Sequence, residues 1–327
     1  MVPLNIQMIN PRSSCSDPDR ISMLVQEMVS LQPDDKEQVC LITGEIIRVV
    51  ADALFRIRQK NPRFRESECS ILAEVTSPMS RRDANAFLCA CFLEYRSGTT
   101  DVWDNVEFFT EDILDNPENI WQSILDHTYE GWEERFDDYT LHPEKKVHIR
   151  LYRIAHLMVR FYAGDGRQIW TGYEHDPESV YKRLLMLQIP RSIACLVVGT
   201  LKDRGYIQGS FDIVGDIVDS RVLGRMICGD GSAITPLKAR RLARMLSPED
   251  PWELDRPLYL IGSHWCGPGP KCRACPVRCV CVLSVSEEIG IRPSPIFRDL
   301  LFGKKSVQWT LKKWQSSTSL RADARED

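Results

Sequence analysis

Apolar residues along this chain recur mostly at helical spacing, and strand-like alternation is scarce. The clearest pattern lies between Pro143 and Tyr162, where apolar positions recur at i, i+4, i+7, i+11 and i+14. This period predicts a helix with one buried stripe. The stripe consists of Val147, Leu151, Ile154, Met158 and Phe161. Pro143 suits the first helical turn, where a missing amide hydrogen leaves no bond unmade.

Further helices are expected on both sides of this one. Thr235 followed by Pro236 predicts a capped helix that runs through Met245. Ser247, with Asp250 three residues later, predicts a capping box for a short helix. Earlier helices are expected at residues 21–31, 36–59, 80–95 and 117–127. Together these patterns predict an all-α fold.

The composition is that of a globular protein, with 43% hydrophobic and 27% charged residues. The longest apolar run, Ile193–Val198, is far shorter than the roughly 18 residues that a membrane-spanning helix needs. The first residues lack a basic start followed by a continuous apolar stretch, so no secretion signal is predicted. We therefore expect a cytoplasmic protein without a membrane span.

Charge is unevenly distributed along the chain, which carries a net −4. Residues 1–140 hold 13 basic against 26 acidic residues, whereas residues 141–281 hold 21 basic against 14 acidic residues. A phosphate backbone responds to the local field of a groove, so the overall acidity does not exclude DNA as a ligand. The net negative charge does argue against strong non-specific binding of DNA.

Five of the twelve cysteines lie between positions 266 and 281. Such clustering in a long intracellular chain favours metal ligation over disulfides. Cys266, Cys272, Cys275 and Cys281 are separated by five, two and five residues, so a short loop can wrap four thiolates around one centre. This arrangement suits a cubane 4Fe–4S cluster with one cysteine per iron, and zinc is the alternative. Cys279 could replace Cys281 as the fourth ligand.

The segment Leu258–Cys266, the cysteine loop after it and Val218–Val222 upstream resemble the endonuclease III and adenine-glycosylase superfamily. Its members are helix-hairpin-helix DNA glycosylases with an iron–sulfur loop. The resemblance extends from about residue 80 to Cys281. This chain has five residues between its first two loop cysteines where the family has six, which leaves the loop shape open.

The resemblance implies a two-lobed all-α fold, with a helical barrel lobe at about residues 98–215 and a cluster lobe made from both flanks. DNA would lie in the groove between the lobes. The implied domains are an acidic helical extension, the glycosylase-like core, the iron–sulfur loop and a tail, at residues 1–78, 79–259, 260–282 and 283–327. The cluster would be structural, ordering a loop that presents Lys271, Arg273 and Arg278 to phosphates.

In the family, a Leu-Pro-Gly-x-Gly turn between two short helices holds a DNA phosphate on its backbone amides. The matching stretch here, Leu187–Ala194, lacks both glycines, and Pro190 has no amide hydrogen to offer. A charged contact from Arg191 could substitute. The expected DNA-binding residues of this hairpin are Gln188, Ile189, Arg191 and Ser192.

By the same resemblance, Asp219 is the catalytic acid, placed at the N-cap of a short helix. A carboxylate there can stabilise the positive charge that builds on deoxyribose as a base departs. Asp216 and Asp212 are the alternatives. Ser192 stands where strand-cutting relatives carry a lysine nucleophile, which favours a monofunctional enzyme, although Lys202 keeps a lyase step open.

The sequence therefore predicts a base-excision glycosylase that hydrolyses the N-glycosidic bond of a flipped-out modified or mismatched base. Double-stranded DNA is the expected partner and the monomer is the expected state. One alternative is a non-catalytic iron–sulfur relative that binds DNA or senses damage, and a bifunctional glycosylase/AP lyase is another. A zinc-stabilised interaction module without a DNA function is the third.

Overall fold

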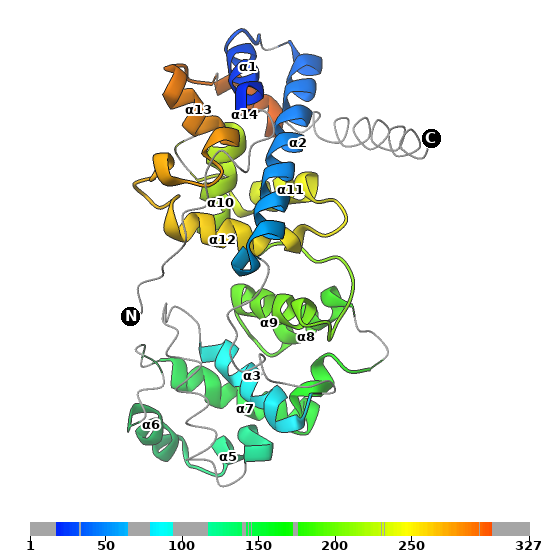
Figure 1. Ribbon diagram of the computed structural model, residues 1–327. Helices are drawn as coiled ribbons and strands as arrows, with labels where there is room; N and C mark the ends of the chain where they lie inside the picture. Colours follow the sequence, from blue (N-terminus) through cyan, green and yellow to red (C-terminus); the bar gives the residue numbers. More distant parts are fainter. Residues whose placement is uncertain are drawn as a thin grey trace. The chain divides into compact units, whose positions relative to one another are not determined.

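The structure, a computed structural model, describes residues 18–32, 34–64, 79–93, 117–138, 142, 144, 146–172, 176–229, 231, 233–293 and 295–302 (Figure 1). These residues form helices and turns and include no β-strand, which confirms the predicted all-α class. The chain divides into two compact units. Unit 1 combines residues 1–66 with residues 212–327, and unit 2 comprises residues 67–211.

Unit 1 contains helices from both ends of the sequence. They are α1 (Pro18–Val29), α2 (Lys36–Lys60), α10 (Ile217–Leu223), α11 (Pro236–Leu246), α12 (Asp255–His264), α13 (Val282–Ile289) and α14 (Pro295–Phe302). A π-helical turn follows α10 directly, at Gly224–Cys228. Short 3-10 turns lie at η2 (Pro62–Phe64), η6 (Pro251–Leu254), η7 (Cys272–Ala274) and η8 (Arg278–Val280).

One hydrophobic core joins these distant segments. Helix α2 contributes Ile46, Val50 and Leu54, which are all fully buried. Val277 and Val280 of the cysteine loop belong to the same core. The long helix before residue 66 therefore helps to build the body that carries the loop, and residues 212–259 belong to that body as well.

Helices α10 and α12 approach each other closely. A Cβ atom at Gly262 would overlap the Cγ1 atom of Val218, so the contact requires glycine on α12. The pairing matters for the site because α10 carries Asp219 and the end of α12 leads into Cys266.

Unit 2 is helical throughout its described part. Its elements are α3 (Arg81–Leu93), η3 (Pro117–Asn119), α5 (Ile120–Leu125), α6 (Tyr129–Asp138), α7 (Val147–Tyr162), η4 (Gly166–Ile169), α8 (Pro177–Met186) and α9 (Arg191–Asp203). Helix α3 lies inside this unit, and every residue from Ala84 to Leu93 is buried.

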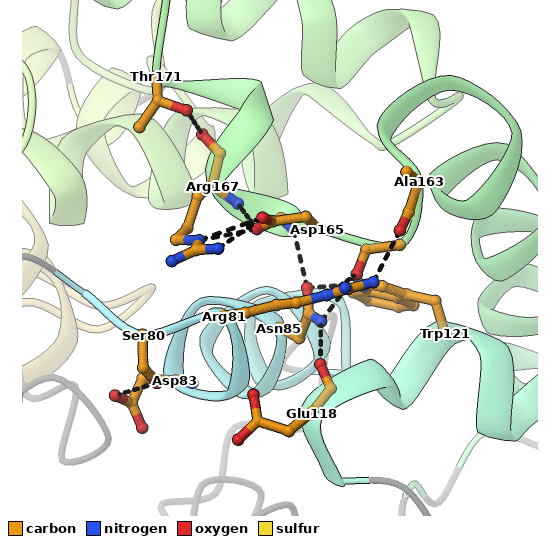
Figure 2. A network of polar contacts seen from close by, with 12 residues as sticks. Ser80, Arg81, Asp83, Asn85, Glu118, Trp121, Ala163, Asp165, Arg167 and Thr171 are labelled. Atoms are coloured by element: carbon orange, nitrogen blue, oxygen red, sulfur yellow. Dashed lines mark hydrogen bonds and ion pairs between the residues drawn. The ribbon is translucent and has the colours of Figure 1, made fainter.

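Asn85 of α3 ties three segments of unit 2 together (Figure 2). Its Nδ2 atom donates to the carbonyl oxygens of Glu118 and Gly164, at 3.2 and 2.9 Å. Its Oδ1 atom accepts from Trp121 Nε1 and from the amide of Gly166, both at 2.8 Å. The side chain is fully buried and all of its hydrogen-bonding capacity is used, which fixes the α7–η4 turn against α3.

The structure also corrects two local predictions. Phe161 is 59% exposed and does not join the buried stripe of α7, since the helix ends one residue later and its last turn can point past the packed body. Ser247 does not open a capping box. It is the C-cap of α11, and its hydroxyl donates to the carbonyl of Asp250 at 2.9 Å. The predicted cap of α11 is confirmed, because Thr235 accepts from the amide of Lys238.

Candidate functional site

The four cysteines predicted as ligands line one cavity of about 20 Å³ in unit 1. All four are free thiols. Cys266, Cys275 and Cys281 are buried and Cys272 is half-buried. Cys279 does not line this cavity and is engaged in a disulfide, which favours Cys281 as the fourth thiol of the set.

Burial disfavours the charged form of these thiols. It raises the pKa of Cys275 to about 12 and places the pKa of Cys281 far above its ordinary value. The neighbouring thiols of Cys266 and Cys272 raise both pKa values further, so a nearby positive charge would favour the thiolate forms. A cationic inorganic centre would supply such a charge, and the thiol donor set fits one.

The described residues hold no group of three or more His, Cys, Asp or Glu side chains already arranged to hold a metal ion. The fit consequently rests on two properties of the four thiols: they share one cavity, and they are the ligand type of iron–sulfur clusters and of structural zinc sites.

Arg225, in the π-helical turn after α10, holds the first residues of the cysteine loop. Arg225 is only 5% exposed. It donates to the carbonyl oxygens of Cys266, Gly267 and Pro268, and to the Sγ atom of Cys266 at 3.4 Å. The Sγ atom of Cys281 lies 3.7 Å from the carbonyl oxygen of Arg225. One residue thus contacts both the first and the last of the four cysteines.

Sequence reasoning missed Arg225, although a signal was present. It stands between Val222, Leu223, Met226 and Ile227, in a helical stretch whose other side chains are buried. A cation at a core position needs partners, and here they are the carbonyl groups of the loop. Arg221 adds a second contact, from Nε to the carbonyl of Cys266 at 2.6 Å.

The basic residues expected on the cysteine loop are accessible to solvent. Lys271 and Arg273 are exposed, and Arg278 is half-buried with its Nη1 atom 3.2 Å from the carbonyl oxygen of Arg273. None of the three is committed to an ion pair among the described residues of unit 1. These three side chains can therefore contact an anion.

Asp219 does not occupy the N-cap that the sequence predicted. Asp216 caps α10, accepting from the amides of Val218 and Asp219, because the helix begins three residues earlier than expected. Asp219 lies in the first turn and is 2% exposed. Its Oδ2 atom accepts from the amide of Gly215 at 2.9 Å. Burial, and then the charges of Asp255 and Asp216, raise the pKa of Asp219 well above its usual range.

The segment before α10 is held by its neighbours. Val214 donates its amide to Asp255 Oδ1 and accepts from Arg240 Nη2. Asp212, the other alternative acid, forms an ion pair with Arg244 at 2.7 Å, and burial raises its pKa. Asp212 thus pairs with a cation and Asp216 caps a helix. Asp219 differs from both, because it is buried beside two other acids and has a strongly raised pKa.

A short turn joins α8 to α9 in unit 2, at the residues for which the sequence predicted the hairpin. Gln188 has a φ of 59°, the left-handed conformation that glycine adopts most readily. The amides of Gln188 and Ile189 donate to the carbonyls of Leu185 and Leu184, and the Ile189 side chain is buried. Ile189 therefore cannot offer its side chain to DNA, and neither amide is free for a phosphate.

The exposed part of the hairpin is the start of α9. Pro190 is the N-cap and provides no side-chain cap, and Arg191 and Ser192 are exposed. The first amides of a helix have no intrahelical acceptor and carry the positive end of its dipole. Arg191 and Ser192 are thus the hairpin positions where an anion can be met.

None of the helices in the described part of the chain has the length and apolarity that crossing a bilayer requires. No protein-family model matches the chain, and no curated protein matches it either.

Proposed function

We propose that this protein is an iron–sulfur DNA glycosylase of the base-excision type, which removes a modified or mismatched base from double-stranded DNA. The observation that carries the proposal is that four free thiols, spaced five, two and five residues apart in the sequence, line one cavity. Cys266, Cys272, Cys275 and Cys281 would hold a 4Fe–4S cluster. The bound cluster supplies structural order to the loop, and the reaction belongs to other residues.

Contacts around the loop support this role. Arg225 and Arg221 tie the loop to α10 and its π-helical turn, so ordering the loop also orders the segment that carries Asp219. Lys271 and Arg273 are exposed on the same loop and would contact the DNA backbone.

The start of α9 supports a second DNA contact. Its first amides and the Arg191 guanidinium would receive a phosphate, since the more usual glycine amides are absent. Such contacts position DNA without reading its sequence. Base selection would therefore depend on other residues, those that surround the extruded nucleotide.

In this proposal Asp219 stabilises the positive charge that develops on the sugar as the glycosidic bond breaks. Burial and two neighbouring acids raise the pKa of this carboxyl well above its usual range in the folded protein. A cationic sugar nearby would lower that pKa and favour the carboxylate. The positive charge of the transition state would thus favour the charged form of the acid.

A second candidate function is a non-catalytic DNA-binding or damage-sensing relative. Two observations favour it: Asp219 is 2% exposed, and Pro190 together with bonded amides replaces the open glycine turn. This candidate retains the cluster and lacks base release.

Metal analysis of protein purified anaerobically tests the cluster. The proposal expects a brown protein with four iron and four sulfide per chain, on the stoichiometry of one cubane. The Cys281→Ser variant should lose iron, while Cys279→Ser should keep it. A colourless protein that binds one zinc would reject the cluster and favour the zinc-stabilised interaction module.

A panel of duplexes with different lesions and mismatches tests the reaction. Wild-type protein should release a base from at least one of them, with strand cleavage only after alkali if the enzyme is monofunctional. Asp219→Asn should abolish base release and keep duplex binding. Asp212→Asn and Asp216→Asn should keep base release. Binding without release across the panel would favour the non-catalytic relative, and cleavage without alkali would indicate the bifunctional enzyme.

A further inference from the structure

A cavity of about 370 Å³ lies in unit 2, between the first half of α7 and the turn that joins α8 to α9. Its size is in the range of pockets that hold small organic ligands, roughly 300–1,000 Å³. Three cationic side chains line it, Lys146, Arg150 and Arg153, and no acidic residue does. They lie at i, i+4 and i+7, which places them on one face of the helix.

The charged side chains around this cavity are all positive. Lys146 is the N-cap of α7 and provides no side-chain cap, so it stands at the positive end of the helix dipole. Lys146 and Arg153 are exposed, and neither pairs with an acid among the described residues. Positive side chains around one concave surface concentrate a positive potential. Such a potential attracts an anionic ligand.

The rest of the cavity wall indicates what accompanies the anion. Ile149 and Leu157 of α7 and Leu187 of the turn provide an aliphatic surface. Such a surface can pack against the sugar or base of a nucleotide. Inorganic phosphate has no apolar atoms that could pack against it. Gln188 also lines the cavity, and Arg191 follows it three residues later at the start of α9. The cavity therefore adjoins the hairpin.

We propose that this cavity binds a phosphate, with its attached sugar, of the DNA strand that the hairpin holds, and that Lys146, Arg150 and Arg153 contact that phosphate. The inference rests on the proposed DNA-binding function and extends its footprint from α9 to α7. The contacts are electrostatic and independent of sequence, so they contribute affinity and a dependence on salt.

A pair of matched double variants tests this site. Lys146→Gln with Arg153→Gln removes two exposed charges of the cavity. Arg160→Gln with Lys182→Gln removes two exposed charges of the same unit, on α7 and α8, that do not line it. Arg150 is left unchanged because it is half-buried. Binding of a fluorescently labelled undamaged duplex is measured by anisotropy over a range of salt concentrations, using the full-length protein with its metal centre.

The cavity variant should bind duplex more weakly, on the order of tenfold at about 0.1 M salt. Its slope of log affinity against log salt should fall by about two, because each removed cation leaves about one phosphate charge without a protein partner. The control variant should differ little from wild type. An equal loss of duplex affinity in both variants, or no loss in either, would contradict the proposed phosphate site. The proposed DNA-binding function would be unaffected by that result. A wild-type protein that binds no duplex would overturn both.

Competition distinguishes a DNA strand from a free anion. Sodium phosphate, compared with sodium chloride at equal ionic strength, should displace duplex from wild-type protein no better than chloride does. A specific displacement by phosphate that the cavity variant lacks would identify a free-phosphate site and overturn the assignment to a DNA strand.

Discussion

The Nη1 atom of Arg225 donates a hydrogen bond to the Sγ atom of Cys266, at 3.4 Å, inside the protein. The same guanidinium reaches three consecutive carbonyl oxygens, those of Cys266, Gly267 and Pro268. Carbonyl oxygens accept the hydrogen bonds of this buried cation and add no formal negative charge beside it. It is therefore suited to stand beside thiolates, whose negative charge burial otherwise opposes.

Arg225→Met should destabilise unit 1 and lower iron incorporation. The substitution keeps an unbranched side chain but leaves several buried carbonyl groups without a donor, so we expect a loss of about 3 kcal/mol in the free energy of unfolding. Urea unfolding and iron content measure the two effects. Arg278→Met is the comparison, because Arg278 is half-buried and makes one hydrogen bond, to the Arg273 carbonyl. Equal effects of the two variants would contradict the role assigned to Arg225.

The raised pKa of Asp219 predicts how stability depends on pH. A group with a higher pKa in the folded state binds its proton more tightly there, so its stabilising effect is complete below the unfolded pKa, about 4, and is lost as pH rises toward the folded pKa. Asp219→Asn is neutral at every pH and retains an acceptor for the Gly215 amide. Its urea midpoint should therefore exceed that of wild type increasingly as pH rises from 4 to 7.

Asp176→Asn provides a comparison of opposite sign. Hydrogen bonds from the Ser179 side chain and amide lower the pKa of Asp176, so its contribution is present above the unfolded pKa and is lost as pH falls. The urea midpoint of Asp176→Asn should become lower than that of wild type as pH rises. A constant gap for Asp219→Asn between pH 4 and 7 would mean that the carboxyl is not buried as the structure has it.

Helical periodicity and capping residues were enough to predict the all-α class and several individual helices, because both are local properties. The helix expected at residues 36–59 is α2, and the one expected from Pro236 is α11. The shared cavity of the four cysteines also follows from local spacing, since the whole loop is short. Local patterns did not distinguish Asp216 from Asp219 as the cap, because both acids stand at the start of α10.

Packing between distant segments could not be predicted in this way. Nothing near Ile46 or Leu54 indicates that α2 shares a core with a loop more than two hundred positions later. The bonds of Asn85 have the same character, since its partners stand at Glu118 and Gly164. An asparagine in a helix is neutral in propensity until its neighbours in space are known.

Asn85→Leu tests that network (Figure 2). Leucine is similar in size and apolar, and it would leave the Trp121 indole, the Gly166 amide and two carbonyls unsatisfied in the interior. We expect unit 2 to lose about 3 kcal/mol in the free energy of unfolding. Gln122→Leu, which removes one exposed hydrogen bond to Asp126, should change it by less than about 1 kcal/mol. Urea unfolding compares the two variants, and similar midpoints would contradict the structural role of Asn85.

The left-handed backbone at Gln188 gives the last prediction. A side chain at a φ of 59° is strained, by about 1 kcal/mol, and a β-branched residue is strained more. Gln188→Gly should therefore raise the free energy of unfolding by up to about 1 kcal/mol, and Gln188→Val should lower it.

The Gln188→Gly variant would also let a phosphate approach the turn more closely, so duplex binding should strengthen in this variant if the hairpin holds DNA. Because Gln188→Val is destabilised by backbone strain and does not remove a charge, its salt dependence of binding should match wild type. A more stable valine variant would show that the turn does not adopt this conformation.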